Sequence, residues 1–413
     1  MSADEPVIRS FLDTDLYKLT MQSAIHNCFP DAKVSFDYHN RTPEKMLTVE
    51  AINWLKRQIK LLGELRFTKD EIDFLKQEVP FLPEQYFKWL ETFKLHPDKE
   101  VIIEDDPSHF DLRVKGNWDQ VTLYEIPLLA LVSEAYFRFV VNKWSNEGQF
   151  EKAKGKSVRL CNNNCAFSEF GTRRRRSFET QRIMMEGLIA GAKESENPSL
   201  FLGTSNVYFA KIYKLKPMGT IAHEWMMGIA AITQDYNNAN KKAMDCWLNT
   251  VGNSHAGLAL TDTFGTDVFL RSFYPPYSDY YSGVRQDSGD PLKFIEKIGH
   301  HYLDVLKLPK FSKSICFSDS LNVDRCIKYK AKADEIGMAC SFGIGTNLTN
   351  DFPDSTPMNI VMKIDSANGH PAVKISDNLG KNTGDPAEVR RVKKVLGYEE
   401  KYWAGGDEEH RWG

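Results

Sequence analysis

CAFSEFGTRRRR, residues 165–176, joins a short apolar run to a group of small and cationic residues. The same pattern recurs down the chain. Runs with the composition of buried strands end in polar residues in SLFLGTSN (199–206), GTIAHEW (219–225), HAGLALTDTFGTD (255–267), GVRQDSGDP (283–291), ICFSDSLNVD (315–324) and CSFGIGTN (340–347). Strands that alternate with helix-forming stretches build a parallel sheet, and chemistry gathers at the carboxyl ends of its strands. The sequence therefore predicts an α/β fold with the site at that edge.

The segments before and after this alternating region have different residue patterns. Residues 50–95 carry apolar positions at helical spacing, and the runs at 101–104, 110–116 and 121–126 have strand-like composition before a long helical stretch at 128–144. We expect an α+β unit here. MNIVMKI (358–364) and PAVKIS (371–376) predict one more strand pair, and the acidic tail is expected to be loose.

Bulk composition narrows the class of protein. The 413 residues, 42% of them hydrophobic, can form a large barrel with a second layer or two ordinary domains. A formal charge of -3 gives no global electrostatic case for nucleic acid or a membrane surface. The seven scattered cysteines suit free thiols, and the start lacks the basic and apolar runs of a secretory signal. We expect a soluble cytoplasmic protein, with a nuclear location left open.

His223 stands behind a Gly-Thr turn and ahead of an apolar run. HEWMM lacks the second histidine of a zinc-protease helix, so that class is disfavoured. One interpretation is a packed, hydrogen-bonded side chain. The other is a base or nucleophile that faces the strand-end loops.

The run GTRRRR (171–176) also has two interpretations. It could be a solvated charge run or an RNA-binding patch, although no aromatic residues are interleaved with it. Because it follows a strand and precedes a helix-forming stretch, we expect at least one arginine to point into the site and bind phosphate or carboxylate.

Two further motifs bring carboxylates and glycines to the same edge. VRQDSGDP (284–291) is either a capped helix start or a site with Arg285 on an anion and Asp287 on ribose hydroxyls or a metal. Asp319 follows the next strand. SFGIGTN (341–347) offers backbone N–H groups for a phosphate. Together these groups suit a phosphorylated sugar.

The ordered set TDLYKLTM (14–21), SEFGTRRR (168–175), GTSN (203–206), GTIAHE (219–224), RQDSGDP (285–291) and FGIGTN (342–347) resembles the nicotinate phosphoribosyltransferases, a type II phosphoribosyltransferase family. The resemblance implies an irregular TIM-like α/β barrel with the active site at residues 151–350. A second α+β domain would be formed by residues 1–150, with residues 351–413 returning to it. It also implies a homodimer in which Tyr17 of one subunit covers the site of the other.

The implied reaction joins nicotinate to phosphoribosyl pyrophosphate, giving nicotinate mononucleotide and pyrophosphate in NAD salvage. ATP hydrolysis would be coupled to it through a phosphohistidine at His223. Magnesium would arrive with ATP and phosphoribosyl pyrophosphate, and no metal would be fixed by the protein alone.

The resemblance also assigns roles residue by residue. Tyr17 and Phe170 would sandwich the pyridine ring, Thr220 and Arg285 would bind nicotinate, and Arg173 would bind its carboxylate or the pyrophosphate. The remaining contacts are Asp287 as a catalytic group at the ribose, Asp319 at the phosphoribosyl group, and Gly343, Gly345 and Thr346 at the 5′-phosphate. Arg174 to Arg176 receive no role.

Ser205 bears on the choice between acid and amide. Related nicotinamide enzymes carry an aspartate in the motif that aligns with GTSN, where a carboxylate would repel nicotinate and a hydroxyl can donate to it. The serine favours nicotinate. The alternatives are a nicotinamide or quinolinate phosphoribosyltransferase and, in a different class, an RNA-binding protein that uses the arginine run.

Overall fold

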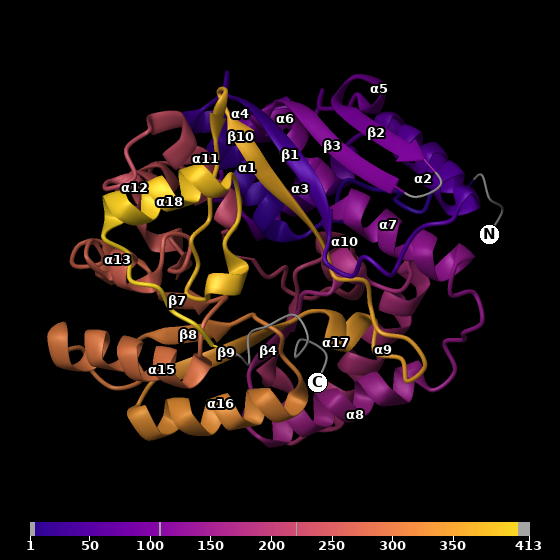
Figure 1. The fold of residues 1–413 in the computed structure, drawn as a ribbon. Helices are drawn as coiled ribbons and strands as arrows, with labels where there is room; N and C mark the ends of the chain where they lie inside the picture. Colours follow the sequence, from indigo (N-terminus) through magenta and orange to yellow (C-terminus); the bar gives the residue numbers. More distant parts are fainter. Residues whose placement is uncertain (1–4, 107–108, 220, 404–413) are drawn as a thin grey trace.

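The computed structural model describes residues 5–106, 109–219 and 221–403. Two sheets organise these residues, an antiparallel sheet in the upper half of Figure 1 and a parallel sheet in the lower half. The predicted α/β class is confirmed. Strand pairs run in the order β5-β4-β9-β8-β7-β6 through the parallel sheet, and closure into a barrel stays a prediction.

The parallel sheet is built from the predicted strand-ending motifs. Its strands are β4 (Phe167–Glu169), β5 (Phe201–Thr204), β6 (Leu258–Leu260), β7 (Gly283–Gln286), β8 (Ser314–Phe317) and β9 (Ala339–Ile344). All the paired neighbours are parallel, and Arg285 of β7 lies opposite Leu260 of β6 and Cys316 of β8. Because the register keeps the strands level, the residues that follow each strand meet at one edge.

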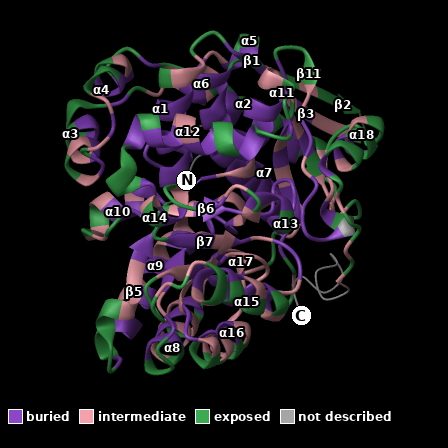
Figure 2. Cartoon of the chain, turned by 90° about the vertical axis from the view of Figure 1, so that its left-hand side faces the viewer, coloured by how far each residue is buried: buried purple, intermediate pink, exposed green. Residues whose placement is uncertain are grey.

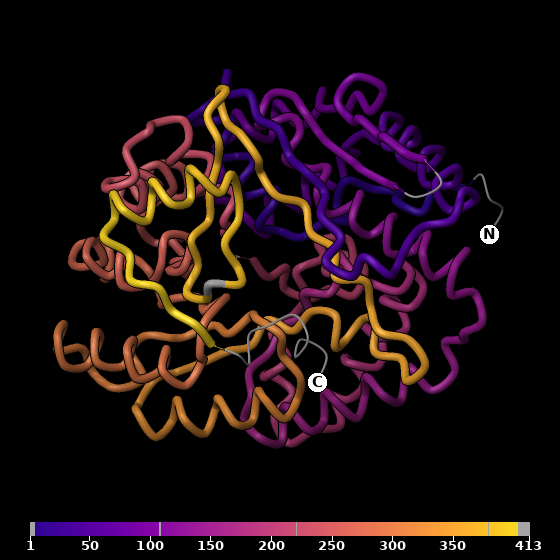
Figure 3. Tube along the Cα trace, in the orientation of Figure 1, coloured from indigo at the N-terminus to yellow at the C-terminus, as the bar shows by residue number. Residues whose placement is uncertain are grey.

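The antiparallel sheet draws on both ends of the chain. Its order is β11-β10-β1-β3-β2, with β1 (Lys33–Asn40), β2 (Val101–Asp106), β3 (His109–Asn117), β10 (Ile360–Ala367) and β11 (His370–Pro371). The orange β10 lies beside the indigo β1 in Figure 3. In the register of this antiparallel pair, Asn40 is opposite Ile360. Residues after 351 thus reach the first strand of the chain.

Helices and loops make up the rest of the described chain. They are α1 (Leu16–Cys28), α2 (Val49–Leu61), α3 (Lys69–Glu78), α4 (Glu84–Leu90), α5 (Pro97–Glu100), α6 (Trp118–Val121), α7 (Glu125–Phe139), α8 (Gln149–Asn162), α9 (Phe178–Glu194), α10 (Val207–Tyr213), α11 (His223–Thr233), α12 (Ala239–Val251), α13 (Thr266–Leu270), α14 (Tyr277–Tyr280), α15 (Pro291–Gly299), α16 (Val323–Ile336), α17 (Thr346–Thr349) and α18 (Pro386–Leu396). The helical pattern predicted over 50–95 is confirmed by α2, α3 and α4.

The capped helix start predicted for VRQDSGDP is confirmed at Asp290 and Pro291. Asp290 caps α15, where its Oδ1 accepts from Leu292 N at 2.9 Å, and Pro291 occupies the first helical position, where no N–H is needed. Asp287, three residues earlier, lines a cavity instead. The capped helix start and the candidate site residue therefore share one loop.

The strand predicted at 121–126 is wrong. These residues form the end of α6, a 3₁₀ turn and the start of α7. Val121, Leu123 and Tyr124 are all buried, and every residue of α7 up to Phe137 is buried as well, as the purple ribbon of Figure 2 shows. A helix that is apolar on all sides shows no amphipathic period, so composition alone suggested a strand.

Two more predicted strands differ in the structure. No strand among the described residues directly precedes His223, which instead begins α11, and the nearest β-bridge joins Thr204 to Pro217. Of PAVKIS, only Pro371 lies in the two-residue strand β11. The tail beyond residue 403 lies outside the described residues. Among the helices of the described ranges, none has the length and apolar character needed to cross a bilayer.

Strands β7 and β8 are so close at Gly283 that the position has no room for a side chain. A Cβ at this position would lie 1.9 Å from the backbone oxygen of Ser314, and neither backbone can give way inside the sheet. We expect Gly283→Ala to lower the free energy of unfolding by at least about 3 kcal/mol, measured by chemical denaturation.

Gly155 is the matched control. It lies inside α8 with nothing within 4 Å of an added methyl group, so Gly155→Ala should raise stability by about 0.5–1 kcal/mol. Equal stability of the two variants would contradict the strand spacing described above.

Candidate active site

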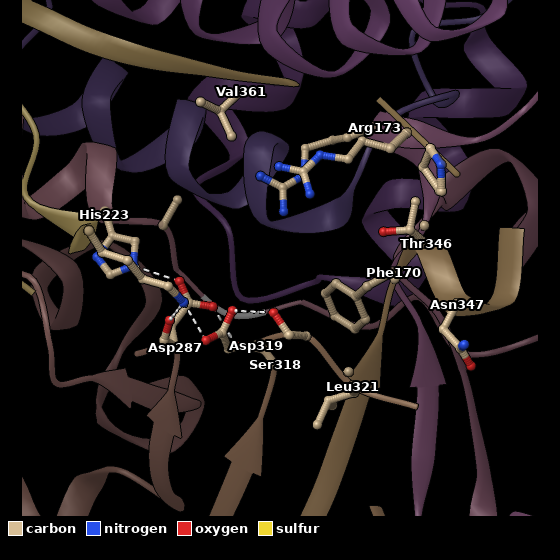
Figure 4. A pocket seen from close by; sticks show the side chains of 18 of the residues that line it. Phe170, Arg173, His223, Asp287, Ser318, Asp319, Leu321, Thr346, Asn347 and Val361 are labelled. Atoms are coloured by element: carbon tan, nitrogen blue, oxygen red, sulfur yellow. Dashed lines mark hydrogen bonds and ion pairs between the residues drawn. The ribbon is translucent and has the colours of Figure 1, made fainter. Parts of the chain in front are cut away.

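One cavity brings the predicted site residues together. It lies between the carboxyl edge of the parallel sheet and strand β10, which contributes Val361 to Ile364. Of the residues predicted for the site, those that line it are Tyr17, Phe170, Arg173, His223, Arg285, Asp287, Asp319, Gly343, Gly345 and Thr346. Figure 4 shows His223 and Asp287 on one side of this space and Arg173 on another, with Phe170 between Asp319 and Thr346.

Strand ends explain this convergence. Phe170 follows β4, Asp287 follows β7, Asp319 comes shortly after β8, and Gly345 follows β9. Gly343 lies under the ring of Phe170, because a Cβ there would meet the ring at 3.4 Å. Gly343 and Phe170 therefore form one continuous part of the cavity wall.

His223 is held on both ring nitrogens. Nδ1 lies 3.0 Å from Thr263 Oγ1, and Nε2 lies 2.8 Å from Asp287 Oδ2 and 2.9 Å from Lys374 Nζ. Burial, followed by the Lys374 ammonium, lowers the pKa of His223 and outweighs the opposing pull of Asp262 and Asp287. The imidazole is therefore neutral near pH 7 and keeps one nitrogen lone pair for nucleophilic attack.

Asp287 remains ionised in this arrangement. Burial alone would raise its pKa, but Arg285 and His223 hold the pKa of Asp287 well below its ordinary value. Its Oδ1 accepts from Arg285 Nη2 at 3.0 Å and from Ser318 Oγ at 2.8 Å. A fixed negative charge thus stands beside the imidazole.

The two candidate arginines differ in how firmly they are held. The Arg285 guanidinium donates to Ser318 Oγ at 2.8 Å, to the Ile221 carbonyl at 2.9 Å and to Asp287. Arg173 makes one polar contact within the described part of the chain, 3.5 Å from Glu125 Oε1, and its side chain is 40% exposed to the cavity. Most donors of Arg173 are therefore available to an incoming anion, whereas Arg285 keeps fewer.

The rest of the arginine run is divided between cavity and core. Arg174 lines the cavity, and its Nε donates to the Ile360 carbonyl. Arg175 is fully buried and makes two 2.8 Å bonds to Asp13. Arg176 is also fully buried, 3.6 Å from the centre of the Phe352 ring. Since two of the four side chains have no exposed surface, the run is no surface patch for RNA.

Three of the residues predicted to contact nicotinate have separate outcomes. Tyr17 lines the cavity of its own chain, and the prediction that the tyrosine at the site arrives from a partner subunit stays a prediction. Ser205 is fully buried outside the cavity lining, and its hydroxyl donates to Asp15 Oδ1 at 2.7 Å, behind Tyr17. Its direct contact with nicotinate stays a prediction. Thr220 lies outside the described residues.

Several cavity residues were not anticipated. Lys363, Lys374 and Lys381 come from the segment after residue 351, and Lys381 contacts Asp319. Glu125 is the first residue of α7 and lies in the segment 121–126 that was predicted as a strand. No catalytic motif marks these residues, although Lys363 and Lys374 lie within the predicted strands MNIVMKI and PAVKIS.

One group of side chains could hold a cation. In the described ranges, His223, Asp262 and Asp287 place ligand atoms within 4.8 Å of one another. Asp262 Oδ1 is buried with no hydrogen-bond partner. Lys374 Nζ already lies 3.3 Å from Asp262 Oδ2, so an ammonium supplies part of the positive charge.

Comparison with known proteins agrees with this geometry. The model of the nicotinate phosphoribosyltransferase family matches residues 165–400, and the model of the family's N-terminal domain matches residues 12–133. The chain belongs to the nicotinate phosphoribosyltransferase family.

Individual relatives of the family agree over nearly the full length. A Saccharomyces cerevisiae protein named nicotinate phosphoribosyltransferase is 56% identical over 99% of both chains, and one from Methanosarcina mazei is 39% identical over 95% of this chain and 98% of its own. Among solved structures, one described as a nicotinate phosphoribosyltransferase from Saccharomyces cerevisiae has a TM-score of 0.94 at 55% identity, covering 96% of this chain and 99% of that one. Another from Porphyromonas gingivalis has a TM-score of 0.87 at 37% identity, covering 95% and 100%.

In this family member, the buried arginines should be needed for folding. Arg175→Met leaves Asp13 charged and buried without its guanidinium, so we expect a loss of about 3–5 kcal/mol in the free energy of unfolding. Urea denaturation measures it. Arg182→Met, which breaks 2.6 Å contacts to Glu179 and Glu186 at the surface, should cost under about 1 kcal/mol. A surface-like cost for Arg175→Met would contradict its structural role.

Proposed function

We propose that the chain joins nicotinate to phosphoribosyl pyrophosphate, with ATP hydrolysis coupled through a phosphohistidine at His223. The supporting observation is the neutral imidazole beside Asp287, in the same cavity as the glycine loop and the aromatic ring of Phe170. The family match and the names of the relatives agree with nicotinate as the substrate. Nicotinate mononucleotide formed in this way would enter NAD biosynthesis.

Coupling would begin at the imidazole. The lone pair of His223 would attack the γ-phosphorus of ATP, the bond to the β-phosphate oxygen would break, and ADP would leave. The phosphoryl dianion would then lie near Lys374, whose ammonium is 2.9 Å from Nε2. This pairing would stabilise the charge gained on phosphorylation.

Phosphoribosyl transfer would follow in the same cavity. Tyr17 and Phe170 would hold the pyridine ring, while the backbone N–H groups near Gly343, Gly345 and Thr346 would hold the 5′-phosphate. The ring nitrogen would attack the anomeric carbon as pyrophosphate leaves. The carboxylate of Asp287 would stabilise the cation-like sugar and its hydroxyls. Water would later release phosphate from His223.

Arg173 is the better candidate for a substrate anion. Its guanidinium has a single 3.5 Å contact in the described structure, whereas Arg285 already bonds Ser318, Ile221 and Asp287. Arg285 would keep Asp287 in place and use its remaining N–H groups on nicotinate with Thr220. Asp319, held by Lys381, would contribute at the phosphoribosyl group.

Magnesium would come with the substrate phosphates. Asp262 and Asp287 fit it, because carboxylate oxygens suit this cation and Asp262 Oδ1 is buried without a partner. The ion would neutralise phosphate charge when bound.

We also propose the division into residues 1–150, 151–350 and 351–413, with the last segment returning to the first. The pairing of β10 with β1 supports it. We also propose a homodimer, in which Tyr17 covers the site of the other subunit. A cytoplasmic or nuclear location stays a prediction.

Phosphorylation of His223 can be measured directly. Incubation with γ-labelled ATP should give acid-labile, base-stable label on the wild type and none on His223→Ala, because the variant lacks the accepting nitrogen. His255→Ala is the control, since His255 is exposed and stacks on Phe81 away from the cavity. Label that persists in His223→Ala would remove the proposed role.

A further inference from the structure

Lys18 is a fully buried cation one residue after Tyr17. Its ammonium lies 2.6 Å from Glu125 Oε2 and contacts Glu224 Oε2, with Thr122 Oγ1 at 3.3 Å. Burying a charge is costly, and buried ion pairs are weak evidence for stability. A role in the cavity that these carboxylates line would therefore explain why Lys18 is buried here.

Both glutamates reach the cavity wall. Glu125 opens α7, Glu224 follows His223 in α11, and both line the cavity. Glu224 Oε1 also accepts from Trp118 Nε1 and Thr122 Oγ1, each at 2.7 Å. Glu224 thus keeps two neutral donors without Lys18.

Glu125 is shared between Lys18 and Arg173. One oxygen lies 2.6 Å from the Lys18 ammonium, and the other lies 3.5 Å from Arg173 Nη1. Burial opposes ionisation of Glu125, but Lys18 and then Arg173 hold its pKa below its ordinary value. The carboxylate is charged, and its closer partner is the lysine.

The charges of these four groups sum to zero. Arg173 and Lys18 are positive, and Glu125 and Glu224 are negative. If Lys18 were neutral, the same cluster would carry one net negative charge beside the guanidinium that is to meet a substrate anion. In a partly buried site such a charge is weakly screened, so its sign would matter for binding.

We propose that Lys18 tunes the affinity of the site for a substrate anion by neutralising Glu125, which leaves Arg173 available to that anion. The inference rests on the proposed function, and it adds a residue that touches neither substrate. The anion is a carboxylate or a phosphate, since Arg173 can bind either. Lys18 is a positioning residue, acting through Glu125 and Arg173.

A purely structural role would behave differently. If Lys18 only pinned α1 to α7 and α11, its loss would loosen the cavity, and binding of charged and neutral ligands would weaken together. Removing the charge of Glu125 would also weaken binding. The electrostatic proposal instead requires opposite signs for the two substitutions.

Three variants separate these two roles. Glu125→Gln removes the negative charge at similar volume, and Lys18→Met removes the positive charge. The double variant removes both. Steady-state kinetics give KM for nicotinate and for phosphoribosyl pyrophosphate, and competition gives the affinity for nicotinamide, a neutral ring of the same shape. Melting temperatures report stability.

Glu125→Gln should lower KM about fivefold for the substrate whose anion meets Arg173, Lys18→Met should raise it about tenfold, and the double variant should lie between them. Nicotinamide affinity should stay within about twofold throughout. A shift in KM for nicotinate alone identifies its carboxylate as the anion, and a shift for phosphoribosyl pyrophosphate alone identifies a phosphate.

Changes of the same sign in both single variants, or equal changes for nicotinamide, overturn the proposal. If Lys18→Met does not fold, Glu125→Gln decides by the sign of its KM shift, and Lys18→Arg should restore wild-type KM within about threefold. A wild type that forms no nicotinate mononucleotide contradicts the proposed function. Variants that miss these signs in an active enzyme contradict only the role of Lys18.

Discussion

The contact between His223 Nε2 and Asp287 Oδ2, at 2.8 Å, joins the proposed phosphate acceptor to the carboxylate proposed to stabilise the ribose. Asp287 follows β7 and His223 begins α11, so the end of a strand and the start of a helix meet at this contact. The same carboxylate is held by Arg285, and the same imidazole lies against Lys374. This partly buried contact is stable because the carboxylate and the imidazole each have further polar partners.

The sequence was sufficient for the fold class and for much of the site. Strand-ending motifs predicted the parallel sheet, and its level register brings Phe170, Asp287 and Gly345 to one cavity, which His223 lines from the start of α11. Local patterns suffice here because parallel strands in register must place their carboxyl ends at one edge. The family comparison then confirmed the resemblance carried by those motifs.

Other features depend on contacts between residues far apart in the chain. Lys374 meets His223 across 151 positions, and Lys18 meets Glu224 across 206, distances that no local pattern encodes. Arg175, which received no role from the sequence, bonds Asp13 across 162 positions. The fully buried start of α7 lacked an amphipathic period, so the first turn of this helix and Glu125 were not predicted.

The central claim is that one cavity couples a phosphorylated histidine to transfer onto nicotinate. The most direct measurement is product formation from nicotinate and from nicotinamide, each with phosphoribosyl pyrophosphate, with and without ATP. We expect nicotinate mononucleotide in preference to the amide product, at a rate that ATP increases. Equal turnover of both pyridines, or turnover indifferent to ATP, would contradict this claim.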